Sequence, residues 1–452
     1  MSNSKADKIG GLVFFLALLF IAFVGGAILV LAKLPPYKFL NDAYVAAGAL
    51  FEKETAYDDP LRTNFWNPAR SEQRGVTIND SERVFPGYTL YTSTDDSSAR
   101  LVALDGTVVH EWRRPYSTVW TTESAIDTPQ PDELVTMREA RVYPNGDMLA
   151  QYIAAGDSPY GYGIVKLDSE SNVIWKYLEH SHHDMEIAPD GRIVTLTHDY
   201  QSQPIEGLDF LVPPYIEDYA VILSPDGDEL KKIPLLPAVA RSKYDDLLIR
   251  GTPHHAVSDV LHANGIEFIT AEKAQNFPYG EPGDLLISFR NISAIAVLDP
   301  ESEEIVWATR GPWIEQHDAD LLPNGDIMLF DNYGNFEEKN LSRVLQFDPE
   351  NMAITWSYHG TDEHPLSSDI RSSAQRLPNG NTLITESNGG RMLEVTREGD
   401  IVWEYFNPVR GGNSDQYIPI ISSGIRIDPA SLEPEFRSTL NPDSNPNRNP
   451  DR

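Results

Sequence analysis

The chain contains no cysteine among its 452 residues. Disulfide bonds, thiolate metal sites and a cysteine nucleophile are therefore excluded, and the redox compartment stays open. Basic residues are scarce: 36 Lys and Arg stand against 68 Asp and Glu, a formal net charge of −32. Such a chain repels nucleic acid, so we expect no nucleic-acid partner. The residues that are present, 41% hydrophobic with 8 Trp, 20 Tyr and 17 Phe, are typical of a globular protein.

Long apolar runs are also scarce, and the one that stands out covers residues 9–32, which include no charged residue. As a helix these residues would span about 36 Å, enough for a hydrocarbon core of about 30 Å. The alternative is a cleaved signal peptide, with Val30-Leu31-Ala32 as the cleavage site, but apolar regions of signal peptides usually have about 7–15 residues. We therefore expect a retained single-pass membrane anchor after a short flank, residues 1–8. The large domain is then expected on the extracytoplasmic, periplasmic side.

The rest of the chain divides into three parts. Residues 33–75 begin with Pro35-Pro36 and have weak periodicity, so we expect a stem or linker with one helix near residues 42–53. Residues 76–427 contain internal repeats. Residues 428–452 are rich in Pro, Asn, Asp and Ser, and we expect them to form a disordered tail.

Two repeated units alternate within residues 76–427. One unit is a strand, a turn and a second strand that usually ends in an aromatic residue, and it occurs at Leu101–Trp112, Ile164–Tyr177, Ala220–Lys232, Ala294–Ala308, Val344–Tyr358 and Leu393–Tyr405. The other unit is a hairpin with a Pro-Asn-Gly or Pro-Asp-Gly turn, whose glycines are Gly146, Gly191, Gly325 and Gly380. Alternating apolar and polar residues flank these turns, as expected of paired strands.

Together the two units make a four-stranded antiparallel meander. Radial repetition of such sheets closes into a β-propeller, and six copies of the first unit predict six blades. The predicted fold class is all-β: a six-bladed β-propeller with an N-terminal transmembrane helix.

Residues that line the central channel can be found by counting from the turn glycines, because the first strand of each blade faces that channel. The residues eight positions before these glycines are Arg138, His183, His317 and Ser372. The residues seven positions after them, expected at the level of the first set, are Ile153, His198, Asn332 and Ser387. In the fourth blade the hairpin is stretched, with His262 in the first strand and Arg290 seven positions after Gly283.

His183, His262, His317 and Arg290 are therefore expected around one channel mouth. A single His-Asp pair at a strand end is more often structural, but three histidines at equivalent positions favour a functional site. Neutral imidazole is a nucleophile and a good leaving group, a second histidine can move protons, and arginine stabilises anionic oxygens. Three imidazoles would also suit zinc in a propeller hydrolase or lactonase. Because Arg290 would repel a cation, we expect an anion there, with no metal and no cofactor.

Several long motifs carry a family resemblance: HHDMEIAPDG, LHANG, SFRNISAIAVLD, QHDADLLPNGDIMLFDN and LPNGNTLITESNGGRMLEVTREGDIVWEYFNP. From about Val84 to Pro408 the chain resembles the aryl-sulfate sulfotransferases, six-bladed propellers of the bacterial periplasm. The resemblance implies transfer of a sulfuryl group from a phenolic sulfate ester to a phenol, without a nucleotide donor, through a transiently sulfated histidine.

Carried onto this sequence, the family's nucleophile falls on His317, and its other catalytic residues fall on His183, His262 and Arg290. We expect Asn332, Arg138 and His198 to contribute to substrate binding. The expected partners are a small aryl sulfate donor, a phenolic acceptor and the membrane. The alternative is a propeller that keeps the site without turnover and acts as a scaffold.

Overall fold

The computed structural model describes residues 3–32, 34–35, 37, 59–205, 208, 211, 213–249, 258–336 and 341–440. The chain divides into two compact units, Met1–Asp59 and Pro60–Arg452. The helix expected near residues 42–53 lies outside the described residues.

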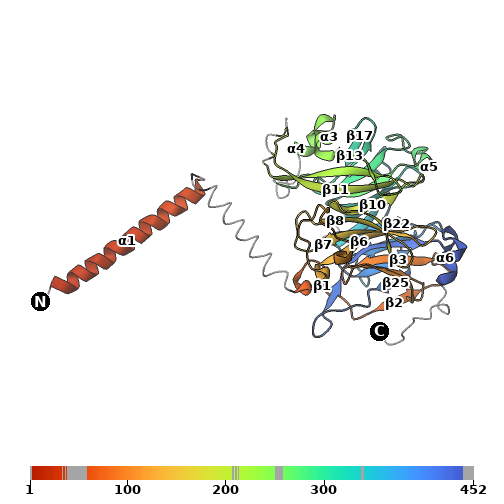
Figure 1. Ribbon diagram of the computed structural model, residues 1–452, viewed down its shortest axis with the longest axis horizontal. Helices are drawn as coiled ribbons and strands as arrows, with labels where there is room; N and C mark the ends of the chain where they lie inside the picture. The colour runs from red at the N-terminus through yellow and green to blue at the C-terminus, as the bar shows by residue number, and fades with distance from the viewer. Residues whose placement is uncertain are drawn as a thin grey trace. The chain divides into compact units, whose positions relative to one another are not determined.

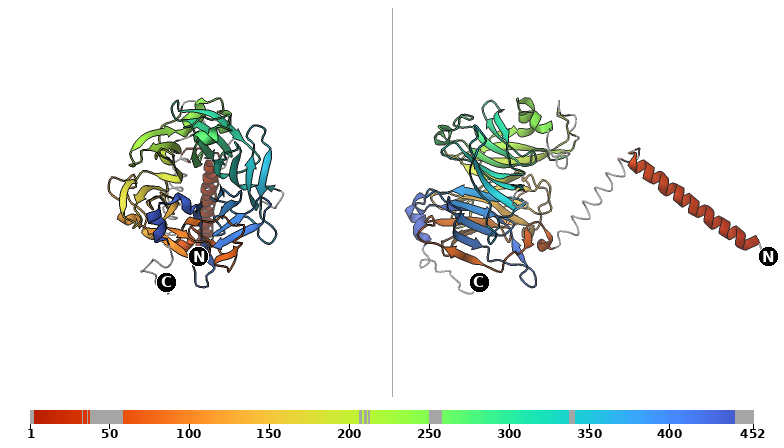
Figure 2. Two further views of the ribbon diagram at one scale, coloured as in Figure 1. Left: turned by 90° about the vertical axis from the view of Figure 1, so that its right-hand side faces the viewer. Right: turned by 180° about the vertical axis from the view of Figure 1, so that it is seen from behind.

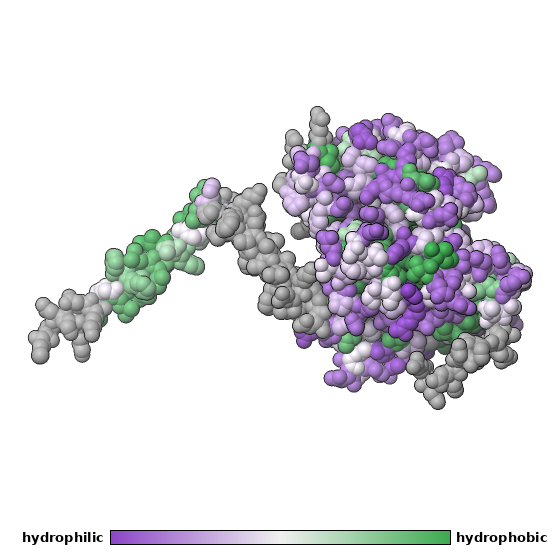
Figure 3. Space-filling model, in the orientation of Figure 1, coloured by the Kyte–Doolittle hydropathy of each residue, from purple (hydrophilic) through white to green (hydrophobic). Residues whose placement is uncertain are grey.

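The first unit contains helix α1 (Asn3–Leu31). Its apolar part, Ile9–Leu31, has 23 residues and a mean hydropathy of 2.9, and the face seen in Figure 3 is hydrophobic. The large side chains of this part are exposed within the helix; Phe20, for example, is 67% exposed. A uniformly apolar helix of this length is consistent with a membrane anchor or with a signal sequence.

The second unit contains a ring of six antiparallel sheets (Figures 1 and 2). Four of them have four strands in sequence order from the channel outward, blade 1 has its last strand innermost, and blade 6 has a fifth strand on its outer edge. The predicted six-bladed β-propeller is therefore confirmed. Blade 1 contains β27 (Ile421–Ile427), β3 (Tyr88–Ser93), β4 (Ser98–Val102) and β5 (Val108–Arg113). Blade 2 contains β6 (Val135–Val142), β7 (Met148–Ala154), β8 (Gly161–Leu167) and β9 (Val173–Tyr177). Blade 3 contains β10 (Ser181–Ile187), β11 (Ile193–Gln201), β12 (Tyr215–Leu223) and β13 (Glu229–Pro234).

Blade 4 contains β14 (Ala263–Phe268), β15 (Leu285–Phe289), β16 (Ala294–Asp299) and β17 (Glu304–Arg310). Blade 5 contains β18 (His317–Leu321), β19 (Ile327–Asn335), β20 (Leu341–Phe347) and β21 (Ile354–Tyr358). Blade 6 contains β22 (Ser373–Arg376), β23 (Thr382–Glu386), β24 (Arg391–Val395) and β25 (Ile401–Phe406). Short helices α3 (Leu235–Arg241), α4 (Asp246–Ile249) and α5 (Ala271–Ala274) lie in connections of blades 3 and 4.

The two ends of the propeller sequence exchange strands: each end adds one strand to the blade formed mainly by the other end. Strand β27 pairs with β3 as the innermost strand of blade 1, so the last strand closes the first sheet. Strand β2 (Gly75–Asn79) pairs with β25 on the outer edge of blade 6. Strand β1 (Trp66–Pro68) pairs with β26 (Tyr417–Pro419), so part of the expected linker at residues 33–75 belongs to the folded domain.

The segment after β27 differs from the disordered tail expected at residues 428–452. A 3-10 turn (Pro429–Ser431) and helix α6 (Pro434–Thr439) follow the last strand. Leu432, Phe436 and Leu440 are buried in the core shared by blades 1 and 2. Three apolar residues spaced four apart thus anchor this segment, while the Pro- and Asn-rich composition belongs mostly to residues 441–452, outside the described residues.

Buried carboxylates join the inner strands of neighbouring blades. Each accepts a hydrogen bond from a backbone N–H of the next inner strand: Asp184 from Ile266 (2.9 Å), Glu186 from Phe268 (2.6 Å), Glu267 from Leu321 (2.7 Å) and Asp318 from Ala374 (2.7 Å). These bonds satisfy strand-edge donors that would otherwise be buried without a partner.

The inner strands also bulge at one level of the channel. The register shifts within β6, β10, β14 and β18. Positive φ angles accompany these bulges at His183 (60°), His262 (50°) and Asp318 (54°). Positive φ is uncommon outside glycine, and bulges often redirect side chains next to active sites. His317 pairs with Phe330 and not, as expected, with Asn332. The ladder next to the turn would already place His317 opposite Asp331, and the bulge shifts the pairing by one more residue.

We predict that Phe436→Ala lowers the free energy of unfolding by about 3–5 kcal/mol, because it leaves a cavity between blades 1 and 2. Phe436 is 5% exposed and its ring lies 6.0 Å from the ring of Trp112. Thermal or chemical unfolding measures the change. The matched control is Phe336→Ala, since Phe336 is 69% exposed. Equal midpoints for the two variants would contradict the anchoring role of α6.

Candidate active site

The structure brings three of the predicted histidines together at the bulged level of the channel. The ring of His183 lies 4.9 Å from the ring of His262 and 6.4 Å from that of His317. The ring of Tyr160, a residue that the sequence did not single out, packs against both His183 (5.6 Å) and His262 (6.4 Å). Blades 3, 4 and 5 each supply one imidazole, and the loop before β8 supplies the tyrosine.

His317 is held in one tautomer by Asn332. The amide nitrogen of Asn332 donates to two backbone carbonyls, those of Ser368 (2.8 Å) and Arg371 (3.1 Å). Its oxygen therefore faces His317 Nδ1, 2.8 Å away, and accepts the Nδ1 proton. The neutral ring then carries its lone pair on Nε2, the nitrogen available for attack.

The three imidazoles differ in how readily they take a proton. Burial, together with the positive charge of Arg290, holds the pKa of His317 well below its usual range. Burial and the neighbouring His262 and His182 do the same to the pKa of His183. Burial also disfavours the charged form of His262, but the Asp259 carboxylate, 2.5 Å from its Nδ1, outweighs that effect and raises its pKa. The site therefore combines two neutral imidazoles with one that favours the imidazolium form.

Arg290 lies beside these histidines but already has partners. Its guanidinium forms an ion pair with Glu315 and donates to the side-chain oxygen of Asn291 (3.0 Å). Its backbone N–H donates to the carbonyl of His262 (3.1 Å), which fixes the two residues relative to each other. Glu315 offsets part of the charge that the sequence led us to expect at the mouth.

Two further arginines approach His317 from another side. Arg138 Nη1 donates to the Ser422 carbonyl (2.5 Å), and Arg371 Nη1 donates to the Ser422 hydroxyl (2.7 Å). Both side chains are more than 90% buried, and the backbone N–H of Arg371 lies 3.3 Å from His317 Nε2. Within the described ranges, Arg371 makes no ion pair with a carboxylate, and burial beside Arg138 holds its pKa well below its usual range. Such a pair favours an anion as the third partner.

Sequence reasoning missed Arg371 because it directly precedes the counted position, Ser372. Both residues have positive φ, 55° and 78°, so the chain turns sharply before β22. Ser372 itself exchanges hydrogen bonds with Ser387, as its cross-strand position suggests, and closes the strand end. No periodic pattern marks a residue that such a turn redirects.

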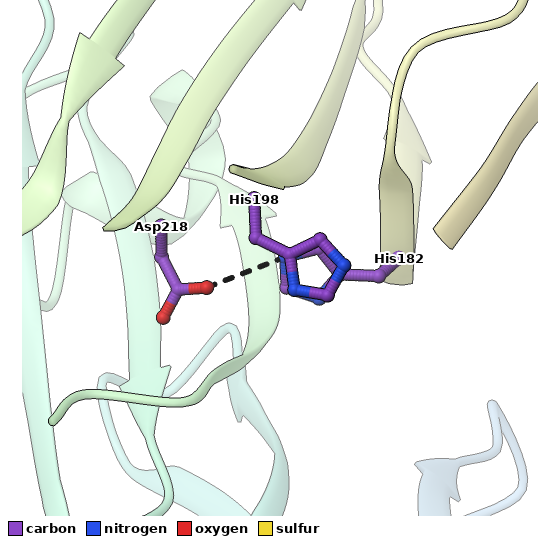
Figure 4. A group of neighbouring side chains, drawn as sticks. All are labelled: His182, His198 and Asp218. Carbon is purple, nitrogen blue, oxygen red and sulfur yellow. Dashed lines mark ion pairs between the residues drawn. The ribbon is translucent and has the colours of Figure 1, made fainter. Parts of the chain in front are cut away.

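His198 occupies a different place from the one expected of a substrate-binding residue. It is 3% exposed, and its ring lies between Tyr160 (4.6 Å) and His182 (4.1 Å), stacked on the latter. Asp218 completes this group, which is drawn in Figure 4. His182, the neighbour that counting rejected in favour of His183, therefore lies behind the mouth as a fully buried residue.

The same group deserves testing as a metal site. Ligand atoms of His182, His198 and Asp218 lie within 4.8 Å of one another. The two imidazoles, however, lie face to face with 29° between their planes (Figure 4). Imidazole binds a metal through lone pairs in the ring plane, and such lone pairs on stacked rings do not converge on one point. The arrangement fits ring stacking and a chain of polar contacts better than zinc coordination.

A cavity of about 20 Å³, room for about one water molecule, lies among Arg138, His183, His317 and Ser422. Beneath it the channel is lined by the carboxyl groups of Glu139, Asp184 and Asp318. Burial raises the pKa of Asp184 to about 7, and burial with the neighbouring acids raises that of Asp318 well above its usual range. Cationic groups, imidazoles and carboxyl groups thus line one small cavity.

Comparison with known proteins gives a family. The model of the family described as Arylsulfotransferase (ASST) matches residues 140–408, more than half of the chain. No curated protein matches. Among solved structures, a protein of unknown function from Bacteroides caccae is 14% identical with a TM-score of 0.46, over 76% of this chain and 99% of that chain. A virginiamycin B lyase from Staphylococcus aureus is 13% identical with a TM-score of 0.33, over 60% of this chain and 69% of that chain.

Similarities as remote as these two carry no argument about activity. The family match is informative, because it runs from β6 to just beyond β25 and includes His183, His262, Arg290 and His317. The chain belongs to the arylsulfotransferase (ASST) family.

Proposed function

We propose that this protein transfers a sulfuryl group from a phenolic sulfate ester to a phenol in two steps, through a covalent intermediate on His317. Family membership supports aryl sulfotransferase activity in general. The observation that carries the finer proposal is the Asn332 contact, which leaves the Nε2 lone pair of a neutral His317 beside a cluster of cationic groups. A scaffold would gain nothing from this arrangement.

In the first step, His317 Nε2 attacks the sulfur of the donor, and the bond between sulfur and the phenolic oxygen breaks. His262, which the Asp259 carboxylate keeps prone to protonation, gives its proton to the departing phenolate. Arg371 and Arg290 stabilise the non-bridging sulfuryl oxygens, which keep their charge throughout. This step uses the aryl sulfate itself as donor and needs no nucleotide.

In the second step, an acceptor phenol loses its proton and its oxygen attacks the same sulfur. The bond between sulfur and Nε2 breaks, and His317 leaves as a neutral imidazole that keeps its Nδ1 proton. Asn332 suits this step because a neutral amide accepts that proton's hydrogen bond without removing the proton. One histidine therefore serves as nucleophile and then as leaving group.

Helix α1 is proposed to remain as an anchor with the propeller on the extracytoplasmic side. Its uniformly exposed apolar surface and its length support this assignment. We expect intact cells or spheroplasts to expose the propeller to added protease, and the mature chain to keep α1. An N-terminus sequenced after Ala32 would instead identify a cleaved signal peptide.

We predict that His317→Ala abolishes transfer, because it removes the Nε2 lone pair that Asn332 positions for attack. Incubation of the parent protein with an aryl sulfate alone should release one phenol per site and add about 80 Da, the mass of a sulfuryl group, at His317. Mass spectrometry of the quenched protein locates the adduct. The control is His359→Ala, since His359 is exposed. An adduct at another residue would contradict the assigned nucleophile.

We predict that Asp259→Asn moves the alkaline limb of the donor step to lower pH. The Asp259 carboxylate raises the pKa of His262, so His262 serves as an acid below that pKa and the step slows as pH rises through it. Without the carboxylate the pKa falls, and the loss begins at lower pH. Rapid-quench measurement of phenol release across pH tests this. Asp226→Asn, at an exposed position, is the matched control; an unmoved limb would reject His262 as the acid.

A further inference from the structure

A chain of buried polar contacts runs from His183 through His182 to Asp218. His183 Nδ1 lies 2.7 Å from Nδ1 of His182. Nε2 of His182 lies 3.4 Å from Oδ1 of Asp218, and Figure 4 shows this carboxylate directed at the ring. His182 is 0% exposed and Asp218 is 3% exposed, so solvent does not compete for these contacts.

Two nitrogen atoms 2.7 Å apart must share one proton. The carboxylate decides which ring carries it, because Asp218 only accepts: its Oδ2 takes the backbone N–H of Ala263 (2.8 Å), and its Oδ1 faces His182 Nε2. A lone pair on His182 Nε2 would face the carboxylate, which repels it. This nitrogen is buried and makes no hydrogen bond to the described residues, and the Asp218 oxygen at 3.4 Å is an ion-pair contact. The proton of His182 therefore lies on Nε2.

The remaining protons follow from that assignment. With Nε2 protonated, His182 Nδ1 has a lone pair and accepts the Nδ1 proton of His183. His183 is then left with its lone pair on Nε2. The stacked ring of His198, 4.1 Å away, holds the plane of His182.

The imidazoles of His262 and His317 and the guanidinium of Arg138 face His183 and oppose its protonation. The hydroxyl of Tyr160 lies 3.3 Å from Nδ1, and burial keeps that hydroxyl neutral by raising its pKa well above the usual range. The carboxyl groups of Glu139, Asp184 and Asp318 line the same small cavity as His183. Asp218 differs from them because it acts on His183 through the ring of His182.

We propose that His182 and Asp218 are positioning residues that hold His183 as the base for the acceptor phenol. This inference rests on the proposed two-step transfer. In the second step the O–H bond of the acceptor breaks, the proton moves to His183 Nε2, and the phenolic oxygen attacks sulfur. The electron pair of the bond between sulfur and nitrogen returns to His317 Nε2. His183 passes its proton to solvent, and solvent restores the proton that His262 gave to the first phenol.

His262 and His183 thereby act in different steps of the transfer. His262 with Asp259 acts on the donor, and His183 with His182 and Asp218 acts on the acceptor. Each pairs with a carboxylate, but one carboxylate is in direct contact and the other acts through a neutral ring. A direct contact favours the imidazolium, and an indirect one leaves a neutral base.

The test is Asp218→Asn, because the Asn side-chain oxygen still accepts the Ala263 N–H. Phenol release without acceptor measures the donor step, and the decay of the preformed adduct on adding acceptor measures the second step. We expect Asp218→Asn to slow the second step about 10- to 100-fold for acceptors with pKa near 10. For acceptors with pKa near 7, which need less help from a base, we expect a loss below about threefold.

Asp199→Asn is the matched control, since Asp199 is exposed on β11 of the same sheet. A second variant, His182→Asn, keeps an acceptor oxygen near the Nδ1 position but loses the link to Asp218, so it should show the same dependence on acceptor pKa. Equal losses across the acceptor series, or equal losses in both steps, would overturn the positioning role. Failure of the parent to release phenol or form the adduct would instead overturn the two-step transfer itself.

Discussion

The hydrogen bonds that carboxylates on one inner strand accept from backbone N–H groups of the next inner strand are the constraint on which the channel depends. Glu186 and Glu267 each span a blade boundary with bonds of 2.6 and 2.7 Å. A strand at the centre of a propeller has one edge without a ladder partner, and water is largely excluded there. These carboxylates satisfy that edge and fix neighbouring blades at one spacing. The bulges directly beside them then present His183, His262 and His317 at one level.

The formal net charge of −32 describes the whole chain, and the charge inside the channel differs from it. Burial raises the pKa of Asp184 to about 7 and that of Asp320 to about 6, so part of the channel acid is uncharged near neutral pH. Arg138 and Arg371 are buried near these acids; Arg138 lies 3.8 Å from Glu139, whereas Arg371 makes no ion pair with a carboxylate of the described residues. An anion entering the mouth therefore meets a local field opposite in sign to that of the whole surface.

Sequence periodicity was sufficient for the blades and for the level of the channel histidines, because turn glycines and strand alternation are local signals. It could not give the bulge that shifts the pairing of His317 to Phe330, nor the left-handed turn that brings Arg371 close to His317. Counting from the turn glycines also chose His183 over His182, and it gave no sign that His182 lies fully buried next to His183. The packing of Phe436 was hidden because its partners come from strands more than 300 residues earlier. Local patterns carry strand identity, whereas contacts between distant segments decide side-chain direction.

The closure of blade 1 by its last strand has a consequence for the order of events during biosynthesis. Ser422, which accepts hydrogen bonds from both Arg138 and Arg371, lies on β27, the last strand of the described part of the chain. Until that strand docks against β3, two guanidiniums lack their shared partner and the ring has an open sheet edge. A nascent chain that has not yet produced β27 would carry the three channel histidines without these contacts. The two arginines are therefore the last part of the candidate site to gain their partners during biosynthesis.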